Sequence, residues 1–257
     1  MLAIISPAKK LDFESDPITD AHTQPVLLKD AEVLARKARK LKRTDLMAMM
    51  GISDKLADLN YQRFQSFKPP FNLANARQAA LSFAGDTYVG LDAPSLKKKD
   101  LEYAQEHLRI LSGLYGVLRP LDLIQPYRLE MGTKFPIDGK ENLYDFWDRR
   151  VTDQLNAATK SHKDRRVINL ASNEYAKVVQ PKALEGGIVT PVFKEIKNGE
   201  ARVLGLFAKR ARGMMARYMI TRRIESEDKL KEFNDGGYEF RPEQSDDRTW
   251  VFTRPQP

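Results

Sequence analysis

The chain of 257 residues contains no cysteine. That absence excludes disulfides, thiol catalysis, thiol-based redox sensing and cysteine-ligated zinc. Histidine is scarce, since only His22, His107 and His162 occur, and they stand far apart outside any His-Glu-x-x-His pattern. We therefore expect neither a metal site nor a bound cofactor, and an iron-handling role has no ligand cluster to support it.

Long hydrophobic runs are also missing. No stretch approaches the roughly 20 apolar residues that span a membrane. The start of the sequence lacks the basic segment and apolar segment of a secretion signal. Because 42% of the residues are hydrophobic, a sizeable core is expected. The sequence has no internal repeat and no linker-like segment, which predicts one soluble, intracellular domain over residues 1–257.

Acidic residues are absent from two strongly basic segments. The net charge is +8, and residues 36–43 and 209–223 each carry six Lys or Arg with no acid, whereas residues 225–257 are acidic on balance. Solvated helix faces usually interleave Glu with Lys, so two acid-free runs favour a surface that binds a polyanion. The candidate phosphate contacts in these runs are Arg39, Lys40, Arg43, Lys209, Arg210 and Arg212.

The segment at about 44–67 is typical of a helix-hairpin-helix. Thr44 is expected to cap a first short helix, and Gly51 to end it in a left-handed conformation. Ile52 would fill the corner and Ser53 would cap the second helix. Backbone N–H groups there, with Lys55, would bind a phosphate oxygen without reading sequence. Ser53 replaces the second glycine usual in such turns. The alternative is a hairpin that only packs.

Residues 107–132 present charged side chains from a stiff loop. The pattern predicts a helix over about 98–112 and a short buried strand over 114–118, followed by a loop that contains two prolines. The loop offers Arg119, Tyr127 and Arg128 to a phosphate or carboxylate. The alternative is that the two arginines pair with nearby acids, Asp122 and Glu130, and only fix the loop.

The remaining segments mix strands and helices without a regular βαβ repeat, which predicts an α+β fold in a single mixed domain. The sequence Asn198-Gly199 predicts a hairpin between strands at 188–196 and 201–207. Other expected strands lie at 2–5, 81–91 (with a turn), 167–170, 238–241 and 249–252, and other expected helices at about 26–43, 141–158, 174–179 and 209–223.

No convincing catalytic constellation is present. Ser6 and Lys9 match the pattern Ser-x-x-Lys, in which lysine activates a serine nucleophile, but Ser6 before a proline is more simply a helix cap. Polar residues at strand ends nevertheless predict a pocket, because α/β proteins bind ligands there. The pocket candidates are Ser6, Lys9, Arg119, Tyr127, Arg128, Asn169, Ser172 and Tyr175.

Several motifs together resemble the YaaA family of bacterial proteins associated with resistance to peroxide stress. They are Ile5-Ser-Pro-Ala-Lys9, residues 111–132, 143–147, 167–175 and 208–218, and the resemblance extends to 233–240. The resemblance implies a cytosolic protein of the oxidative-stress response that binds DNA through a basic cleft and a helix-hairpin-helix element. It implies no defined enzymatic reaction.

Two functions remain open on the sequence. The first is a cytoplasmic protein that binds duplex or structured DNA through its phosphates, with no membrane or protein partner indicated. The alternative is an enzyme with an arginine-lined pocket that acts on a nucleotide or a flipped base. A closed pocket that holds Lys9, Arg128 and Asn169 at hydrogen-bonding distance would favour the enzyme. An open groove lined by residues 209–223 would favour DNA binding.

Overall fold

One mostly parallel sheet forms the centre of the protein. The computed structural model describes residues 1–15 and 18–257. The strand order is β11-β12-β9-β8-β1-β5-β6, with β10 paired to β9, and only β6, β10 and β11 run antiparallel to their neighbours. The strands are β1 (Leu2–Ile5), β5 (Leu108–Ser112), β6 (Gly116–Leu118), β8 (Val167–Leu170), β9 (Ile188–Lys197), β10 (Glu200–Arg202), β11 (Glu239–Phe240) and β12 (Thr249–Pro255). Two small ribbons pair β2 (Lys10–Leu11) with β4 (Phe83–Ala84) and β3 (Arg77–Gln78) with β7 (Leu123–Ile124).

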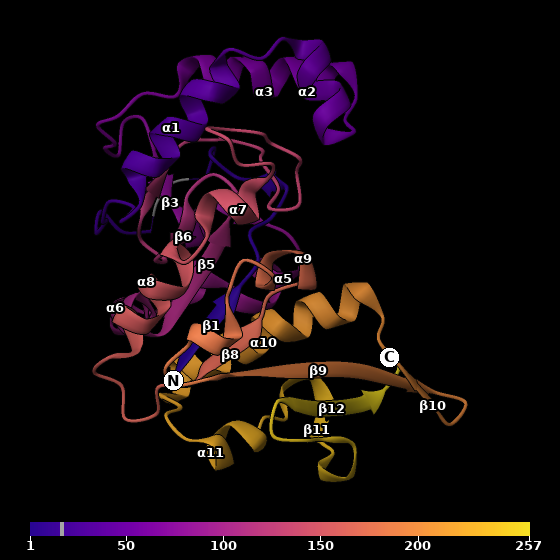
Figure 1. Cartoon of the computed structure of the whole chain (residues 1–257). Helices are drawn as coiled ribbons and strands as arrows, with labels where there is room; N and C mark the ends of the chain where they lie inside the picture. The colour runs from indigo at the N-terminus through magenta and orange to yellow at the C-terminus, as the bar shows by residue number, and fades with distance from the viewer. Residues whose placement is uncertain (16–17) are drawn as a thin grey trace.

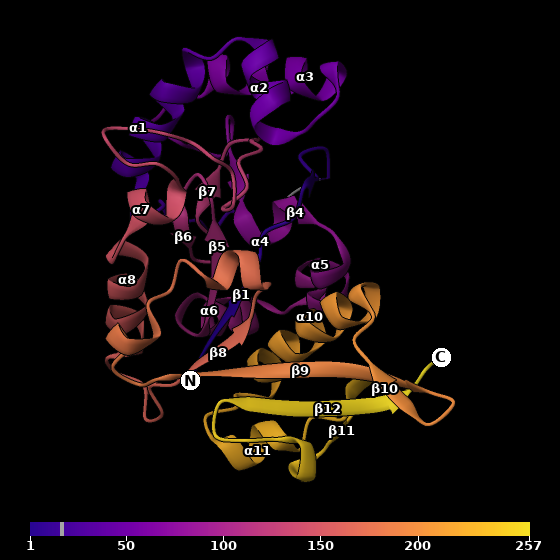
Figure 2. The ribbon, with the colours of Figure 1, turned by 45° about the vertical axis from the view of Figure 1, so that its right-hand side comes forward.

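Helices surround this sheet and extend it at one end. Helix α10 packs against α5, α6, β1 and β9, and α8 lies on the other side of β1 (Figure 2). Helices α1, α2 and α3 form an arm at the opposite end of the molecule from β9 and β12 (Figure 1). The helices are α1 (Leu28–Arg39), α2 (Arg43–Met50), α3 (Asp54–Ser66), α4 (Ala79–Ser82), α5 (Asp86–Leu91), α6 (Lys98–His107), α7 (Leu143–Trp147), α8 (Arg150–Thr159), α9 (Asn173–Ala176), α10 (Gly205–Arg222) and α11 (Glu227–Lys231).

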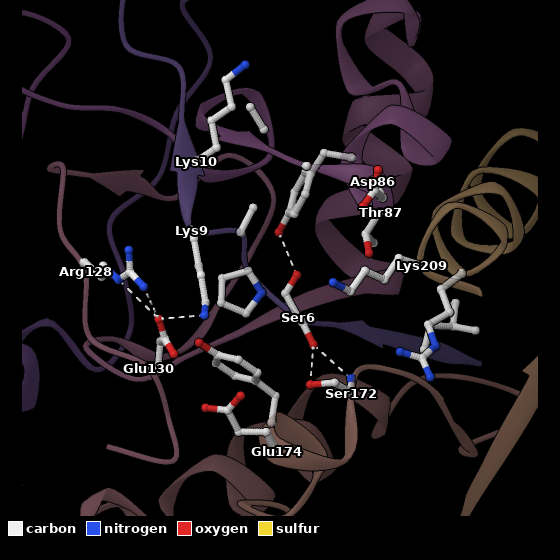
Figure 3. A pocket seen from close by; sticks show the side chains of 18 of the residues that line it. Ser6, Lys9, Lys10, Asp86, Thr87, Arg128, Glu130, Ser172, Glu174 and Lys209 are labelled. Carbon is white, nitrogen blue, oxygen red and sulfur yellow. Dashed lines mark hydrogen bonds and ion pairs between the residues drawn. The ribbon is translucent and has the colours of Figure 1, made fainter. Parts of the chain in front are cut away.

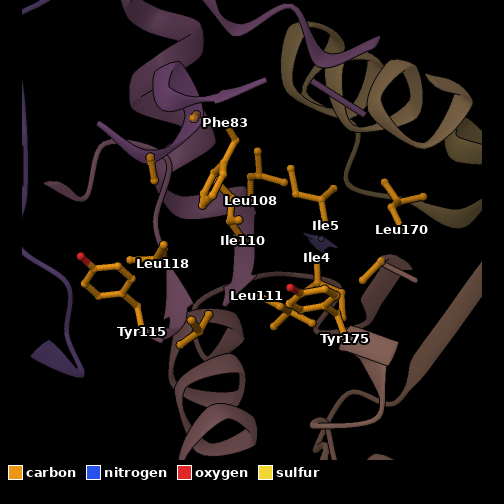
Figure 4. Packing of buried hydrophobic residues seen from close by; sticks show 14 of the residues in the cluster. Ile4, Ile5, Phe83, Leu108, Ile110, Leu111, Tyr115, Leu118, Leu170 and Tyr175 are labelled. Atoms are coloured by element: carbon orange, nitrogen blue, oxygen red, sulfur yellow. The ribbon is translucent and has the colours of Figure 1, made fainter. Parts of the chain in front are cut away.

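The core is built on both faces of the central strands. All four residues of β1 are buried, as are all five of β5 and all four of β8. Strands buried on both faces are characteristic of parallel sheets, whose faces are covered by helices. Figure 4 shows Ile4 and Ile5 of β1 beside Leu111 of β5 and Leu170 of β8. This packing fixes the carboxyl ends of β1 and β8, which are followed in the chain by the polar residues Ser6 and Ser172.

Helices α5 and α10 approach closely because a glycine stands on each side of their contact. A Cβ atom on Gly90 would lie 2.1 Å from the carbonyl oxygen of Arg210, and one on Gly213 would lie 1.8 Å from that of Thr87. Both distances are far below any real carbon–oxygen contact. The two backbones therefore pack directly on each other, and this contact fixes the position of the first half of α10.

The mixed fold predicted from the sequence is confirmed, together with several of its elements. The strands at 2–5 and 167–170 are β1 and β8. The hairpin turn lies at Asn198 and Gly199, whose φ values of 53° and 80° are those of a two-residue turn with left-handed positions. Residues 225–257 contain the expected second pair of strands, β11 and β12.

Other boundaries were wrong, and the main error concerns the centre of the sheet. The expected helix over 98–112 ends at His107, and the next five residues form β5, which pairs with β1. The segment 81–91 contains α4, β4 and α5 instead of one strand, and the helix over 26–43 ends at Arg39. The helix over 141–158 is divided into α7 and α8 at Asp148, which has a φ of 45°.

Three more expectations failed, two on helix capping and one on strand length. Ser6 does not cap a helix, since residues 6–9 are irregular and lead into β2. Thr44 is not the cap of α2, because Asp45 accepts a hydrogen bond from the backbone N–H of Lys42 and the helix begins at Arg43. The strand over 201–207 ends at Arg202, and α10 begins at Gly205.

Four planar side chains stack in a column beside the amino terminus. The rings of Tyr103 and His107 are 3.8 Å apart and those of His107 and His162 are 4.3 Å apart, both nearly parallel. The guanidinium of Arg223 lies 4.4 Å from the Tyr103 ring. Burial, followed by repulsion from His107, lowers the pKa of His162 from its ordinary 6.5 to about 4. The stack thus favours a neutral His162.

We expect this stack to make the fold sensitive to acid. Because the pKa of His162 is lower in the folded chain than in the unfolded chain, the unfolded chain binds more protons between pH 6.5 and pH 4. The stabilisation is complete above pH 6.5 and is lost as the pH falls through this window. As the pH falls from 6.5 to 4, the melting temperature of His162→Phe should therefore fall less than that of the parent protein, because phenylalanine retains a ring but does not titrate. An equal loss in both proteins would refute this role of His162.

The contact between α5 and α10 gives a second prediction. Alanine favours a helix over glycine by about 1 kcal/mol, yet the added methyl of Gly213→Ala meets the Thr87 carbonyl. We expect overpacking to cost a net of about 1–3 kcal/mol in urea unfolding. Gly205→Ala is the matched control, since a Cβ there meets nothing within 4 Å, and it should be neutral or stabilising. Equal stability of the two variants would contradict the direct backbone contact.

Candidate functional site

A cavity of about 430 Å³ opens at the carboxyl ends of β1 and β8. In the sheet, β1 lies between β5 and β8. The chain passes from β1 to β5 on one side and later returns to β8 on the other side. This arrangement is a topological switch point, where open α/β sheets bind their ligands. Figure 3 shows that the lining comes from the segment after β1, from α5, α9 and α10, and from the loop around Arg128 and Glu130.

The residues that end the two strands are joined to each other. The Oγ of Ser6 accepts a hydrogen bond from the backbone N–H of Ser172 at 2.9 Å and lies 3.3 Å from its Oγ. The hydroxyl of Tyr88 in α5 donates to the carbonyl of Ser6 at 3.0 Å. These bonds hold β1, β8 and α5 in a fixed relation, so the wall of the cavity is rigid at this point.

Two cations share one carboxylate at the edge of the cavity. Glu130 Oε1 lies 3.2 Å from the Nζ of Lys9 and 3.0 Å from Nη2 of Arg128. The side chain of Arg128 is only 16% exposed, whereas that of Lys9 is 66% exposed. Glu130 thus bridges two cations at this edge of the cavity. Arg128 therefore pairs with Glu130, as one alternative expected, and it also lines the cavity, as the other expected.

Three tyrosines line the cavity. Burial raises the pKa values of the hydroxyls of Tyr88, Tyr127 and Tyr175, so all three are neutral. The Tyr127 hydroxyl is 2.6 Å from Oγ of Ser112, and the Tyr88 hydroxyl is bonded to Ser6. Because these two hydroxyls already have partners in the protein, Tyr88 and Tyr127 contribute mainly apolar ring atoms to the cavity.

Helix α10 supplies two further cations to the same cavity. Lys209 and Arg212 lie one turn apart and both line it, and Figure 3 shows the Lys209 side chain directed towards Ser6. Throughout residues 1–15 and 18–257, no acid forms an ion pair with either of them. Burial lowers the pKa of the Arg212 guanidinium. A half-buried guanidinium without a carboxylate partner is suited to an anionic ligand.

Two of the pocket candidates lie elsewhere. The Nδ2 of Asn169 donates to Thr190 Oγ1 at 3.1 Å, and its Oδ1 accepts from the Ala171 N–H, so this side chain serves the sheet. Arg119 donates to the buried carboxylate of Asp122 at 3.1 Å, which is the loop-fixing alternative. Burial raises the pKa of Asp122 despite this bond. The other six candidates line the cavity: Ser6, Lys9, Tyr127, Arg128, Ser172 and Tyr175.

The hairpin of the arm has a left-handed turn between two helices. Gly51 ends α2 with a φ of 59°, Ile52 is buried, and Ser53 Oγ accepts from the Leu56 N–H at 3.4 Å as the cap of α3. Within the described ranges, no acceptor lies opposite the N–H groups of residues 53–55. These donors face solvent at the start of a 13-residue helix, and Lys55 is exposed beside them.

The basic segments are less available than the sequence suggested. In the first, Arg39 donates to the carbonyl oxygens of Phe64 and Phe67, and Arg43 pairs with Asp58 at 2.8 Å. These two candidates therefore help to hold the arm together. Lys40 is exposed, with no ion pair among the residues that the structure describes.

The second basic segment is largely a core helix. Eight residues of α10 are buried, because they pack on α5 and the sheet. Arg217 donates to the carbonyls of Leu91 and Asp92, and Arg223 pairs with Asp100 at 2.7 Å. Within the described ranges, the cations of this helix that form no ion pair are Lys209, Arg210, Arg212 and Arg222, and Arg222 lies over the Tyr218 ring.

Sequence reasoning missed three acidic or polar residues of the cavity. Asp86 and Thr87 begin α5, and Glu174 lies in α9 and accepts from the Gly132 N–H at 3.0 Å. The first two were hidden by the wrong strand assignment, although Gly85-Asp86 before an apolar run is a helix-start signal. In residues 1–15 and 18–257, no three His, Asp or Glu side chains converge closely enough to hold a metal ion.

Comparison with known proteins gives the family. The family model described as "Peroxide stress protein YaaA" matches residues 1–244. The chain belongs to this family. It is 54% identical over 254 residues to a UPF0246 protein of Magnetococcus marinus, covering 99% of each chain. A UPF0246 protein of Alteromonas mediterranea is 53% identical over 256 residues (100% of this chain, 99% of the relative), and one of Cellvibrio japonicus is 50% identical over 257 (100% of both). The resemblance to the YaaA family is therefore confirmed.

The two loop arginines should respond differently to substitution. Arg119→Met leaves the buried carboxylate of Asp122 with fewer partners, and we expect urea unfolding to show a loss of about 1–3 kcal/mol, the usual cost of losing a hydrogen bond to a charged group. Arg128→Met leaves Glu130 partly exposed and still paired with Lys9, so its loss should stay within about 1 kcal/mol. A larger loss for Arg128→Met would show that Arg128 is mainly structural.

Proposed function

We propose that this protein binds DNA in the cytoplasm, through backbone phosphates and with little sequence specificity, as its part in the response to peroxide stress. The family supports the stress response. Among the described residues, no helix is both long enough and apolar enough to cross a membrane. The DNA-binding element is a helix-hairpin-helix, with a basic surface on α10.

The observation that carries this proposal is the turn between α2 and α3. Gly51 adopts the left-handed conformation, Ile52 is buried below the turn, and the N–H groups of residues 53–55 point to solvent. Such N–H groups at a helix start bind a phosphate oxygen whatever the base attached to it. Lys55 and Lys40 are exposed cations of the same arm, and they add electrostatic attraction to the negatively charged phosphates.

The cations of α10 provide a second point of contact. Lys209 and Arg210 are exposed and Arg212 is half-buried, and within the described part of the chain they form no ion pairs. Arg217 and Arg223 are bound to protein groups and Arg222 lies over the Tyr218 ring, so we place this contact on the first half of the helix. A basic cleft would thus extend from the arm to α10.

The cavity supports a second candidate function, the enzyme with an arginine-lined pocket that acts on a nucleotide or a flipped base. Its volume of about 430 Å³ is in the range of small-molecule sites. It is lined by cations and also by carboxylates, including Asp86 and Glu174. A carboxylate is a group that can transfer a proton in a reaction. Of the three residues that were to mark a closed pocket, Lys9 and Arg128 are present and Asn169 is not.

The turn can be tested without changing the net charge. Gly51→Val places a β-branched residue at a φ of 59°, which such residues resist, so the turn and its N–H groups should shift. We expect duplex binding to weaken by about 1–3 kcal/mol, as for the loss of one or two charge-assisted hydrogen bonds. Gly51→Asn is the matched control, because asparagine tolerates the left-handed conformation, and it should bind as the parent does.

Salt dependence separates this effect from general attraction. Both variants retain the net charge of +8, so the fall of log affinity with log salt, about 0.9 per phosphate contacted by a cation, should keep its slope. Circular dichroism and melting must first show that each variant is folded. If a folded Gly51→Val protein binds duplex DNA as tightly as Gly51→Asn, the hairpin only packs and the proposal fails at its main point.

A further inference from the structure

We infer that the cavity at the ends of β1 and β8 binds one nucleoside monophosphate unit, with its phosphate on Arg212 and Lys209 and its base against the buried tyrosines. This deepens the second candidate function and does not depend on the hairpin. The unit is either a free nucleotide or a nucleotide extruded from a bound strand, because the recognised groups are the same in both.

The wall of the cavity suits a flat aromatic ring better than a sugar. A carbohydrate needs many hydrogen-bonding groups, but the hydroxyls of Tyr88 and Tyr127 are already bonded to Ser6 and Ser112. Tyr127 is part of an aromatic cluster, with its ring 5.3 Å from that of Tyr115. Tyr88, Tyr127 and Tyr175 are each 6–8% exposed, so what they offer is the apolar ring edge that reaches the cavity, against which a nucleobase packs.

The charge of the cavity suits a phosphate. Lys9 and Arg128 are partly neutralised by Glu130, whereas Lys209 and Arg212 have no ion-pair partner in the described ranges. Arg212 is half-buried, and its guanidinium presents several donors to one anion, the geometry that phosphate recognition uses. A phosphate beside α10 therefore supplies the counter-charge that the protein does not.

This arrangement predicts opposite effects on stability and binding. Burying a cation without a partner costs free energy, so Arg212→Met, which keeps the apolar stem, should leave the melting temperature unchanged or raise it. The same variant should lose the part of phosphate-dependent nucleotide binding that Arg212 supplies. A residue with only a structural role would lower the melting temperature, so this pair of measurements separates the two roles.

The test uses the full chain and three probes measured by titration calorimetry: dAMP, deoxyadenosine and deoxyribose 5-phosphate. We expect dAMP to bind about 10- to 100-fold more tightly than deoxyadenosine, the range for hydrogen bonds to a charged group, and about 5- to 100-fold more tightly than deoxyribose 5-phosphate. Arg212→Met should reduce the first difference to the part that Lys209 alone supplies. Arg222→Met is the control, since this arginine lies in the last turn of α10 over the Tyr218 ring, away from the cavity lining.

A second arm identifies the source of the nucleotide. Parent and variants are titrated with a fully paired duplex and with the same duplex carrying one unpaired adenosine. A preference for the unpaired adenosine that Arg212→Met reduces would assign the cavity to an extruded nucleotide, and Gly51→Val should weaken both duplexes equally. If dAMP binds in a phosphate-dependent way but the protein does not prefer the duplex with the unpaired adenosine, the cavity is assigned to a free nucleotide. Equal affinities for dAMP and deoxyadenosine, combined with no preference between the duplexes, would overturn the inference, whatever the hairpin does.

Discussion

Helices α5 and α10 meet backbone to backbone at Gly90 and Gly213, and the placement of Lys209, Arg212 and Asp86 in the cavity depends on this contact. Side chains at these two positions would separate the helices, since an added Cβ at Gly213 would lie 1.8 Å from the carbonyl oxygen of Thr87. The contact brings Lys209 and Arg212 over the carboxyl ends of β1 and β8. It also places the first turn of α5, with Asp86 and Thr87, beside Lys209 (Figure 3).

The sheet fixes the other wall of the site. Strand β1 lies between β5 and β8. The connections that follow these strands diverge at the carboxyl end of β1, and this divergence leaves a crevice there. Ser6 closes the crevice at its base by accepting the Ser172 N–H. Residues from two groups that the sequence kept apart, the strand-end candidates and the first cations of the basic helix, therefore line one cavity. The DNA-binding and nucleotide-binding hypotheses consequently share Lys209 and Arg212.

The sequence predicted the mixed fold, β1, β8 and the hairpin turn, because these depend on local apolar runs and on turn residues. Six of its eight pocket candidates line the cavity. It failed at β5, where Leu108 and Leu111 continue the apolar spacing of α6, and only pairing with β1 decides for a strand. It expected Asn169 in the pocket, whereas this side chain bonds to the distant Thr190. For Arg119 it left two interpretations open, and the structure shows the pairing with the buried Asp122. No local pattern reveals which face of a strand or loop a polar side chain takes.

The central claim is that the start of α3 and the first half of α10 both contact DNA. The most direct measurement is nuclear magnetic resonance of the labelled protein during titration with a short duplex. We expect shifts at the backbone amides of residues 53–55 and at the Nε of Arg212, with little change in residues 225–257. Shifts confined to other surfaces, with these amides and Arg212 unaffected, would contradict it.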